Sequence, residues 1–301
     1  MKLLLLGKDG QVGRGLRPAL APLGEVVALG HAEADFEQPG ELPRLVATHA
    51  PDVIVNAAAY TAVDKAESDA DRARLVNVEA VAALAGAAQR RGAWLVHYST
   101  DYVFDGEKPE PYAESDAPNP LGVYGATKSR GDQAIADSGC RHLIFRVSWV
   151  FGDGDRHFAG AMLRLARDRT ELSVVGDQVG APTSAGRIAE ATATALSHVE
   201  RQGDAAEGLS GLYHLAATDS VSRADYARFV VGEAQTLGLP LTLEPDNITA
   251  IPTAEYPTPA KRPLNSRLAT GKLTAAFAID LPPWQQDVRE WVRAASVGGI
   301  A

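Results

Sequence analysis

The chain of 301 residues is long enough for two domains or for one large α/β unit. Its shares of hydrophobic residues (46%) and charged residues (22%) are those of an ordinary globular protein and exclude a disordered or fibrous chain. The net charge of −9 disfavours a nucleic-acid partner, and the single cysteine, Cys140, excludes an intramolecular disulfide. The opening apolar run is too short for a signal peptide and no run is long enough to span a membrane. We therefore expect a cytoplasmic protein with no membrane partner.

Short apolar runs alternate with alanine-rich stretches through the first half of the chain. The first run, Lys2–Gly7, is continuously apolar after its lysine, which is typical of a strand buried on both faces of a parallel sheet. Further strands are predicted at 25–29, 53–58, 94–99 and 142–149, and helices at 11–23, 69–90 and 124–136. The alternation of strand and helix predicts an α/β fold with a doubly wound parallel sheet.

The second half of the chain changes character, with six prolines between residues 240 and 263. We expect helices near 222–237 and 283–295 in a smaller α/β domain that packs on the first. The runs 172–175 and 211–216 are interpreted as strands that return to the main sheet. The predicted main domain thus comprises residues 1–150 with returning segments at about 172–217, and the smaller C-terminal domain comprises about 151–171 and 218–301.

A glycine-rich turn, Gly7-Lys8-Asp9-Gly10-Gln11-Val12-Gly13, joins the first predicted strand to the first helix. Its first glycine permits a tight turn, the second lets the backbone approach a pyrophosphate, and the third allows close packing of helix and strand. The start of the following helix offers free N–H groups to that phosphate. The main domain is therefore predicted to be Rossmann-like and to bind a dinucleotide.

The end of the second predicted strand bears on which dinucleotide is bound. An acidic residue there would accept a hydrogen bond from the 2′-hydroxyl of the adenine ribose and favour NAD. The sequence has Leu29-Gly30-His31 instead, and Arg14 and His31 are candidates to lie near a 2′-phosphate. This pattern favours NADPH, with NADH as the alternative.

Three residues predict the chemistry of a reductase. Tyr124 and Lys128 are four residues apart on one face of a predicted helix, and Thr100 follows the fourth strand at the edge of the sheet where ligands bind. A lysine ammonium near a tyrosine favours the phenolate and lowers the tyrosine pKa from about 10. Tyr124 would then give a proton to a carbonyl oxygen as a hydride reaches the carbon. Thr100, Tyr124 and Lys128 are the candidate catalytic residues.

With these features and several longer motifs, the chain resembles the dTDP-4-dehydrorhamnose reductase family of the extended short-chain dehydrogenase/reductase superfamily. The resemblance covers nearly the whole chain. Besides the glycine-rich turn, it rests on Pro51–Glu67 (PDVIVNAAAYTAVDKAE), His97–Phe104 (HYSTDYVF), Asn119–Lys128 (NPLGVYGATK), Asp177–Thr183 (DQVGAPT) and Arg262–Arg267 (RPLNSR).

The resemblance implies an NADPH-dependent oxidoreductase that reduces the C4 ketone of dTDP-4-dehydro-L-rhamnose to dTDP-L-rhamnose. This would be the last step of dTDP-rhamnose biosynthesis, which supplies cell-surface carbohydrate such as lipopolysaccharide. Tyr124 would be the proton donor, Lys128 would hold the nicotinamide ribose and tune Tyr124, and Thr100 would complete the triad. The main domain would bind the cofactor and the smaller domain the nucleotide-sugar.

The resemblance also implies which residues bind each ligand. The dTDP-sugar would contact Thr100, Asp101 and Trp149 and, at its diphosphate, Arg262; packing in the core is the alternative role for Trp149. The residues implied for the cofactor are Gly7, Gly10, Gln11, Val12, Gly13, Asp35, Phe36, Ala59, Tyr60, Thr61, Tyr98, Tyr124 and Lys128.

The sequence departs from the family at a metal site. Some members are dimers bridged by a magnesium ion through glutamates, and the matching positions here are Gly15, Gly186 and Gln285. None of these residues can supply the carboxylate oxygens that Mg²⁺ prefers. We therefore expect no metal cofactor, and either a monomer or a homodimer without that bridge.

Two alternative functions stay open at this stage. A related nucleotide-sugar epimerase or dehydratase would keep NAD bound, but a dehydratase would be expected to have Thr-Asp-Glu where this chain has Thr100-Asp101-Tyr102. A non-catalytic, NADP-binding regulatory subunit would be favoured by a degraded triad, whereas all three triad residues are present.

Overall fold

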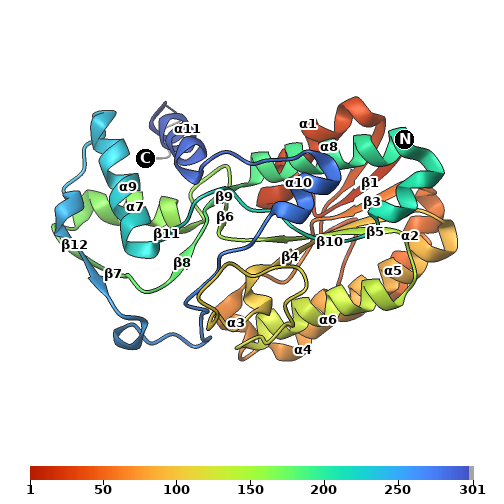
Figure 1. Cartoon of the computed structure of the whole chain (residues 1–301), viewed down its shortest axis with the longest axis horizontal. Helices are drawn as coiled ribbons and strands as arrows, with labels where there is room; N and C mark the ends of the chain where they lie inside the picture. Colours follow the sequence, from red (N-terminus) through yellow and green to blue (C-terminus); the bar gives the residue numbers. More distant parts are fainter. Residues whose placement is uncertain (298–301) are drawn as a thin grey trace.

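The computed structural model describes residues 1–297, and a six-stranded parallel sheet forms its centre (Figure 1). The order of the strands is β10-β5-β4-β3-β1-β2, and every neighbouring pair is parallel. This confirms the predicted doubly wound sheet. The strands are β1 (Lys2–Leu6), β2 (Glu25–Leu29), β3 (Val53–Asn56), β4 (Trp94–Thr100), β5 (His142–Val147) and β10 (Gly211–His214).

Helices cover both faces of this sheet, which explains why its strands are mostly apolar. In β1, Leu3 and Leu5 belong to the core cluster on one face, and Leu4 and Leu6 to the cluster on the other. One face is covered by α1 (Gln11–Leu20), α8 (Ala185–Gln202) and α10 (Gly271–Phe277), and the other by α2 (Leu42–His49), α5 (Ala80–Arg91) and α6 (Val123–Asp137).

The helix predicted over 69–90 is interrupted. After α3 (Val63–Ala66), the chain forms α4 (Ala70–Arg74), a π-helical turn at Leu75–Glu79, and then α5. The side chain of Asn77, inside the π turn, bonds to both backbone groups of Tyr60. Such π turns cluster at functional sites, and this one anchors a segment predicted to contact the cofactor.

A smaller group of elements packs beyond one end of the sheet (Figure 1). Its core is made by apolar residues such as Val230, Trp284 and Val288. The helices are α7 (Phe158–Asp168), α9 (Arg223–Thr236) and α11 (Trp284–Val297), and the paired strands are β6 (Val150–Phe151) with β9 (Thr183–Ser184), β7 (Leu172–Val175) with β12 (Ile248–Ile251), and β8 (Val179–Gly180) with β11 (Val221–Ser222).

One of the two predicted returning strands joins the main sheet. β10 lies at its edge beside β5, as expected for 211–216. The expectation for 172–175 is wrong, because β7 pairs with β12 in a separate two-stranded sheet. In β7, Ser173 is exposed and Val174 buried, so only one face is covered, unlike the strands of the central sheet. Within residues 1–297, we find no helix with the length and apolar character to cross a membrane.

Candidate active site

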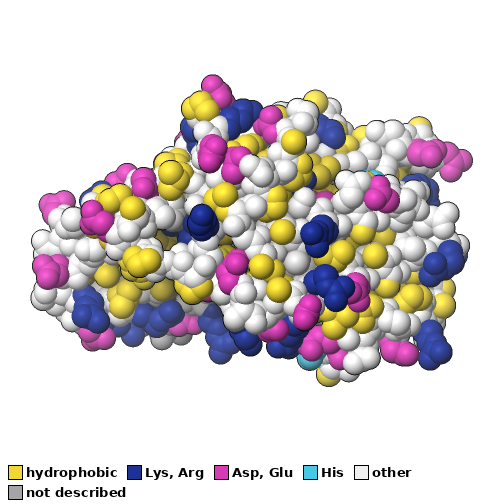
Figure 2. Space-filling view, turned by 90° about the horizontal axis from the view of Figure 1, so that it is seen from below, with side chains coloured by type: hydrophobic (Ala, Val, Ile, Leu, Met, Phe, Trp, Pro, Cys, Tyr) yellow, Lys and Arg dark blue, Asp and Glu magenta, His cyan; other side chains and the backbone are white. Residues whose placement is uncertain are grey.

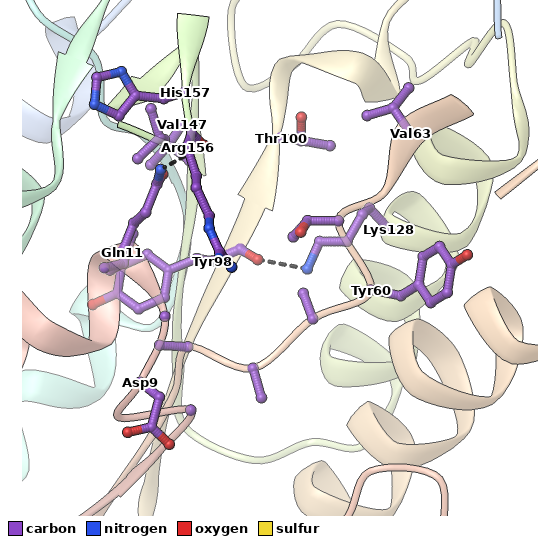
Figure 3. A pocket seen from close by; sticks show the side chains of 18 of the residues that line it. Asp9, Gln11, Tyr60, Val63, Tyr98, Thr100, Lys128, Val147, Arg156 and His157 are labelled. Atoms are coloured by element: carbon purple, nitrogen blue, oxygen red, sulfur yellow. Dashed lines mark hydrogen bonds between the residues drawn. The ribbon is translucent and has the colours of Figure 1, made fainter. Parts of the chain in front are cut away.

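A cavity of about 1180 Å³ opens along the carboxyl ends of the parallel strands (Figure 3). This volume exceeds the 300–1000 Å³ or so of a pocket for one small ligand and leaves room for two. Most of the predicted site residues line it. These are Gly7, Gly10, Gln11, Val12, Asp35, Phe36, Ala59, Tyr60, Thr61, Tyr98, Thr100, Asp101, Tyr124, Lys128 and Trp149. Gly13 and Arg262 are not among the lining residues.

The glycine-rich turn has the geometry of a phosphate-binding loop. Gly7 has φ of +84°, and a Cβ there would lie 2.7 Å from the Ala58 nitrogen. A Cβ on Gly13 would lie 2.0 Å from the Gly7 oxygen, so Gly13 serves the packing of α1 rather than the cavity wall. A Cβ on Gly10 would have its nearest neighbour, the Gly7 oxygen, at 3.5 Å, so this position is open. Helix α1, which follows Gly10, has no acidic residue in its first turn. The N–H groups at the start of α1 therefore suit an anion.

Near the glycine-rich turn and Gly30, the structure has carboxylates that the sequence pattern did not indicate. A Cβ on Gly30 would lie 2.2 Å from Asp9 Oδ2, and Glu33 Oε2 accepts a hydrogen bond of 2.8 Å from the Gly30 nitrogen. Lys8 Nζ lies 2.6 Å from Glu33 Oε1 and lowers the pKa of Glu33. Lys8 thus balances one of the two charges. Arg14 and His31 also line the cavity.

The environment of Tyr124 differs from the expectation. Burial raises its pKa above the ordinary value, and the neighbouring Thr100 hydroxyl opposes this only in part. Lys128 Nζ donates to the Tyr98 carbonyl oxygen at 2.6 Å (Figure 3), and the expected lowering of the Tyr124 pKa by Lys128 stays a prediction. Tyr124 is therefore held in its protonated form, which is the form that donates a proton.

Lys128 is fully enclosed, and its contacts include two residues that the sequence reasoning missed. Its Nζ lies 3.0 Å from His97 Nε2, and His97 Nδ1 lies 3.0 Å from Asn56 Nδ2. Burial lowers the pKa of Lys128 to about 8, although the nearby Asp132 carboxylate acts in the opposite direction. The available signal was that Asn56 and His97 are polar residues within otherwise apolar strands.

Asp101 and Trp149 stand on the side of the cavity toward the smaller group of elements. Asp101 Oδ1 accepts a hydrogen bond of 3.1 Å from Thr100 Oγ1, whereas its buried Oδ2 has no protein partner among the described residues. Burial raises the pKa of Asp101 to about 6. Trp149 is half-buried with φ of +45°, an uncommon backbone conformation for a large residue. It contributes to the cavity wall as well as to packing.

The arginine nearest to this side is Arg223 rather than Arg262. Arg262 forms a double ion pair with Asp64, with Nη1–Oδ1 of 2.9 Å and Nη2–Oδ2 of 2.7 Å, which occupies its fork. Arg223, at the start of α9, lines the cavity with its guanidinium 3.5 Å from the centroid of the Trp149 ring. The sequence reasoning missed Arg223, since a single arginine at a helix start carries no motif.

Comparisons with known proteins agree with one another. The family model described as the RmlD substrate binding domain matches residues 1–297. The chain is 48% identical over 293 residues to the dTDP-4-dehydrorhamnose reductase of Escherichia coli (strain K12), covering 96% of each protein. The crystal structure of a dTDP-4-dehydrorhamnose reductase from Clostridium acetobutylicum is similar with a TM-score of 0.88 at 32% identity, covering 98% of this chain and 100% of that one. That of the Bacillus anthracis reductase, in complex with NADP, has a TM-score of 0.86 at 29% identity, covering 97% and 99%.

Proposed function

The chain belongs to the dTDP-4-dehydrorhamnose reductase family, and we propose that it reduces the C4 ketone of dTDP-4-dehydro-L-rhamnose to dTDP-L-rhamnose with NADPH. The observation that carries this proposal is that one cavity combines the glycine-rich turn with Thr100, Tyr124 and Lys128. It has room for a dinucleotide and a nucleotide-sugar side by side.

The residues present fit the cofactor. The turn and the start of α1 would take the pyrophosphate, and the segments that contain Phe36 and Tyr60 would enclose the adenosine half. Arg14 and His31 would face a 2′-phosphate, which is the basis for preferring NADPH. When bound, the reduced nicotinamide supplies a hydride to the substrate.

The chain's own residues supply the proton and the orientation of the ketone. The Tyr124 hydroxyl gives its proton to the ketone oxygen while the ketone carbon gains the hydride, so the product is an alcohol and Tyr124 is left as a phenolate. The Thr100 hydroxyl holds the same oxygen by a hydrogen bond. A charged Lys128 would stabilise the phenolate as it forms.

For the sugar nucleotide, we propose a subsite formed by Asp101, Trp149 and Arg223. Asp101 would accept a hydrogen bond from a sugar hydroxyl, and Trp149 would cover one face of the sugar. Arg223 would face the diphosphate, since Arg262 is paired with Asp64. In this proposal, the smaller group of elements, which includes β7 together with α7, α9 and α11, provides the substrate side.

The experiment that tests the function follows the loss of reduced-nicotinamide absorbance. The purified protein receives NADPH, or separately NADH, together with the 4-keto sugar nucleotide made by the upstream epimerase. We expect stoichiometric loss of NADPH that depends on the sugar and on Tyr124. An altered sugar without loss of NADPH would indicate an epimerase or dehydratase. NADPH binding with no change in either compound would indicate a regulatory subunit.

We also propose that the protein acts in the cytoplasm. Both proposed ligands are charged nucleotides, and charged groups cross an apolar layer only at high cost in free energy. The protein and its two ligands would therefore share one aqueous compartment.

A further inference from the structure

A chain of three buried polar side chains lies behind the triad. Asn56 of β3, His97 of β4 and Lys128 of α6 contact one another in turn, and each is at most 1% exposed. Buried polar groups are normally paired donor to acceptor, because an unmatched group costs the free energy of its lost hydration. The donor and acceptor of each hydrogen bond along these three side chains can therefore be worked out from the end where a backbone group fixes the donor.

The fixed end is a backbone group. The Ala58 N–H, which can only donate, lies 3.0 Å from Asn56 Oδ1. The other half of the amide, Nδ2, is also only a donor, and it faces His97 Nδ1 at 3.0 Å. His97 Nδ1 must therefore accept. Burial lowers the pKa of His97 well below its usual range and keeps the ring neutral, so its single proton is on Nε2.

This tautomer places a donor against Lys128. His97 Nε2–H points to Lys128 Nζ at 3.0 Å. An ammonium group has three donors and no acceptor, so two donors would meet. A free amine has one lone pair that accepts from His97, and it can still donate to the Tyr98 carbonyl at 2.6 Å. The donors and acceptors of this hydrogen-bonded series are thus matched only when Lys128 is uncharged.

The other charged groups near Lys128 do not reverse this result. Asp132, four residues further along α6, favours the ammonium form. Its Oδ2 accepts from Ser99 at 2.8 Å and from Arg146 at 3.3 Å, and its buried Oδ1 has no hydrogen-bond partner within residues 1–297, Lys128 included. On the strands that pack against Lys128, its polar contacts are His97 and the Tyr98 carbonyl, and Asn56 reaches it only through His97.

We propose that Asn56 and His97 are positioning residues that set the charge of Lys128 and hold it as a free amine in the arrangement described. Protonation of Lys128 requires the His97 proton to reside on Nδ1 and the Asn56 amide to turn over. The kinetic part of the inference rests on the proposed function. Lys128 assists Tyr124 only when it is charged, so Asn56 and His97 would set the upper pH limit of the reduction.

The tautomer can be measured directly without any substrate. Nitrogen-15 NMR of the full chain labelled at histidine distinguishes a protonated ring nitrogen from a bare one. The His97 signals are assigned by their loss in His97→Gln. We expect a protonated Nε2 and a bare Nδ1 at about pH 9, above the pKa of Lys128, where the lysine is a free amine. A protonated Nδ1 with a bare Nε2 would overturn the proposal, because Nε2 would then accept from a charged Lys128.

The kinetic test uses His97→Gln, which changes no charge. A glutamine amide can turn its oxygen to the lysine, so the pKa of Lys128 rises and the fall of kcat/KM at alkaline pH moves upward by about one pH unit. Val96→Ala, in the same strand, is the control for lost packing and leaves the profile in place. A His97→Gln profile that also stays in place overturns the proposal. A wild-type protein without reductase activity but with a protonated Nε2 contradicts the proposed function alone.

Discussion

Burial, rather than residue type alone, sets the chemistry of the individual site residues. Burial shifts the pKa values of Tyr124, Asp101 and Lys128 toward the uncharged form of each side chain. For Tyr124 this is useful, since a tyrosine that gives a proton must hold it until the ketone arrives.

Removing the Tyr124 hydroxyl should therefore remove the reduction while leaving cofactor binding nearly unchanged. We expect Tyr124→Phe to lower kcat by about 10²–10⁴-fold, the usual contribution of a general acid. The dissociation constant for NADPH should stay within about twofold, because the phosphate-binding turn is unchanged. Turnover near the wild-type rate would exclude Tyr124 as the proton donor.

Arg14 offers a test of cofactor choice. It lines the adenosine end of the cavity, while Arg17, one turn further along α1, does not. If Arg14 faces the 2′-phosphate, Arg14→Ala should lower kcat/KM for NADPH by about tenfold or more and leave that for NADH unchanged, because a charged hydrogen bond is lost only with NADPH. Arg17→Ala is the matched control. An equal loss with both cofactors would contradict the assignment.

Arg223 should act on the other ligand. Arg223→Leu keeps an apolar contact with Trp149 but removes the charge, so KM for the sugar nucleotide should rise by about 10–100-fold with NADPH binding unchanged. Arg223→Lys should restore part of the loss. Arg293→Leu, at an exposed position of α11, controls for the change in net charge. An unchanged KM in Arg223→Leu would show that another residue binds the diphosphate.

Among the elements, the short strands beyond the main sheet determine where Trp149 lies. A Cβ on Gly180 of β8 would come within 2.5 Å of the indole, and the Arg223 guanidinium lies 3.5 Å from the ring centroid. Trp149 is thus held between two elements while its backbone adopts φ of +45°. Such backbone strain persists where the surroundings enforce it, as they do here.

Gly180→Ala should displace Trp149 and weaken the binding of the sugar. We expect a rise of several-fold in KM for the sugar nucleotide, with the affinity for NADPH unaffected. Gly186→Ala, near the start of α8, is the control, because the nearest atom to a Cβ there is 3.4 Å away. Kinetics of the two variants decide the matter: equal KM values would show that the position of Trp149 does not govern substrate binding.

The sequence predicted those elements whose pattern is local. The continuous apolar run of β1, the glycine-rich turn and the Tyr124–Lys128 spacing all follow from neighbouring residues. The pairing of β7 with β12 did not, because a four-residue strand has no feature that selects its sheet. Arg223 and the Asn56–His97 pair were missed for the same reason, since their roles arise from contacts between segments far apart in the chain.

At the scale of the whole molecule, a net charge of −9 coexists with a site proposed for two anionic ligands. Acidic and basic side chains are interspersed over the face seen in Figure 2. Attraction of the ligands must therefore come from local groups, namely Arg14, Arg223 and the start of α1, rather than from the overall field.

The residues at the positions that the family resemblance links to magnesium supply no carboxylate of their own. Gly15 packs against Ala185, and neither Gly15 nor Gly186 has a side chain to bind an ion. Next to Gly186, Arg187 pairs with Asp287 at 2.9 Å and with Glu190 at 3.0 Å, so a cation already occupies these carboxylates.

We therefore expect the mass of the protein in solution, measured by light scattering after gel filtration, to be the same with excess Mg²⁺ and with EDTA. Mg²⁺ prefers several oxygen ligands in octahedral geometry. The guanidinium of Arg187 repels a cation from the carboxylates of Asp287 and Glu190, with which it pairs. Arg187→Gln, which removes the competing cation, is the sensitised variant. A dimer that dissociates in EDTA in the wild-type protein would show that other carboxylates form the bridge.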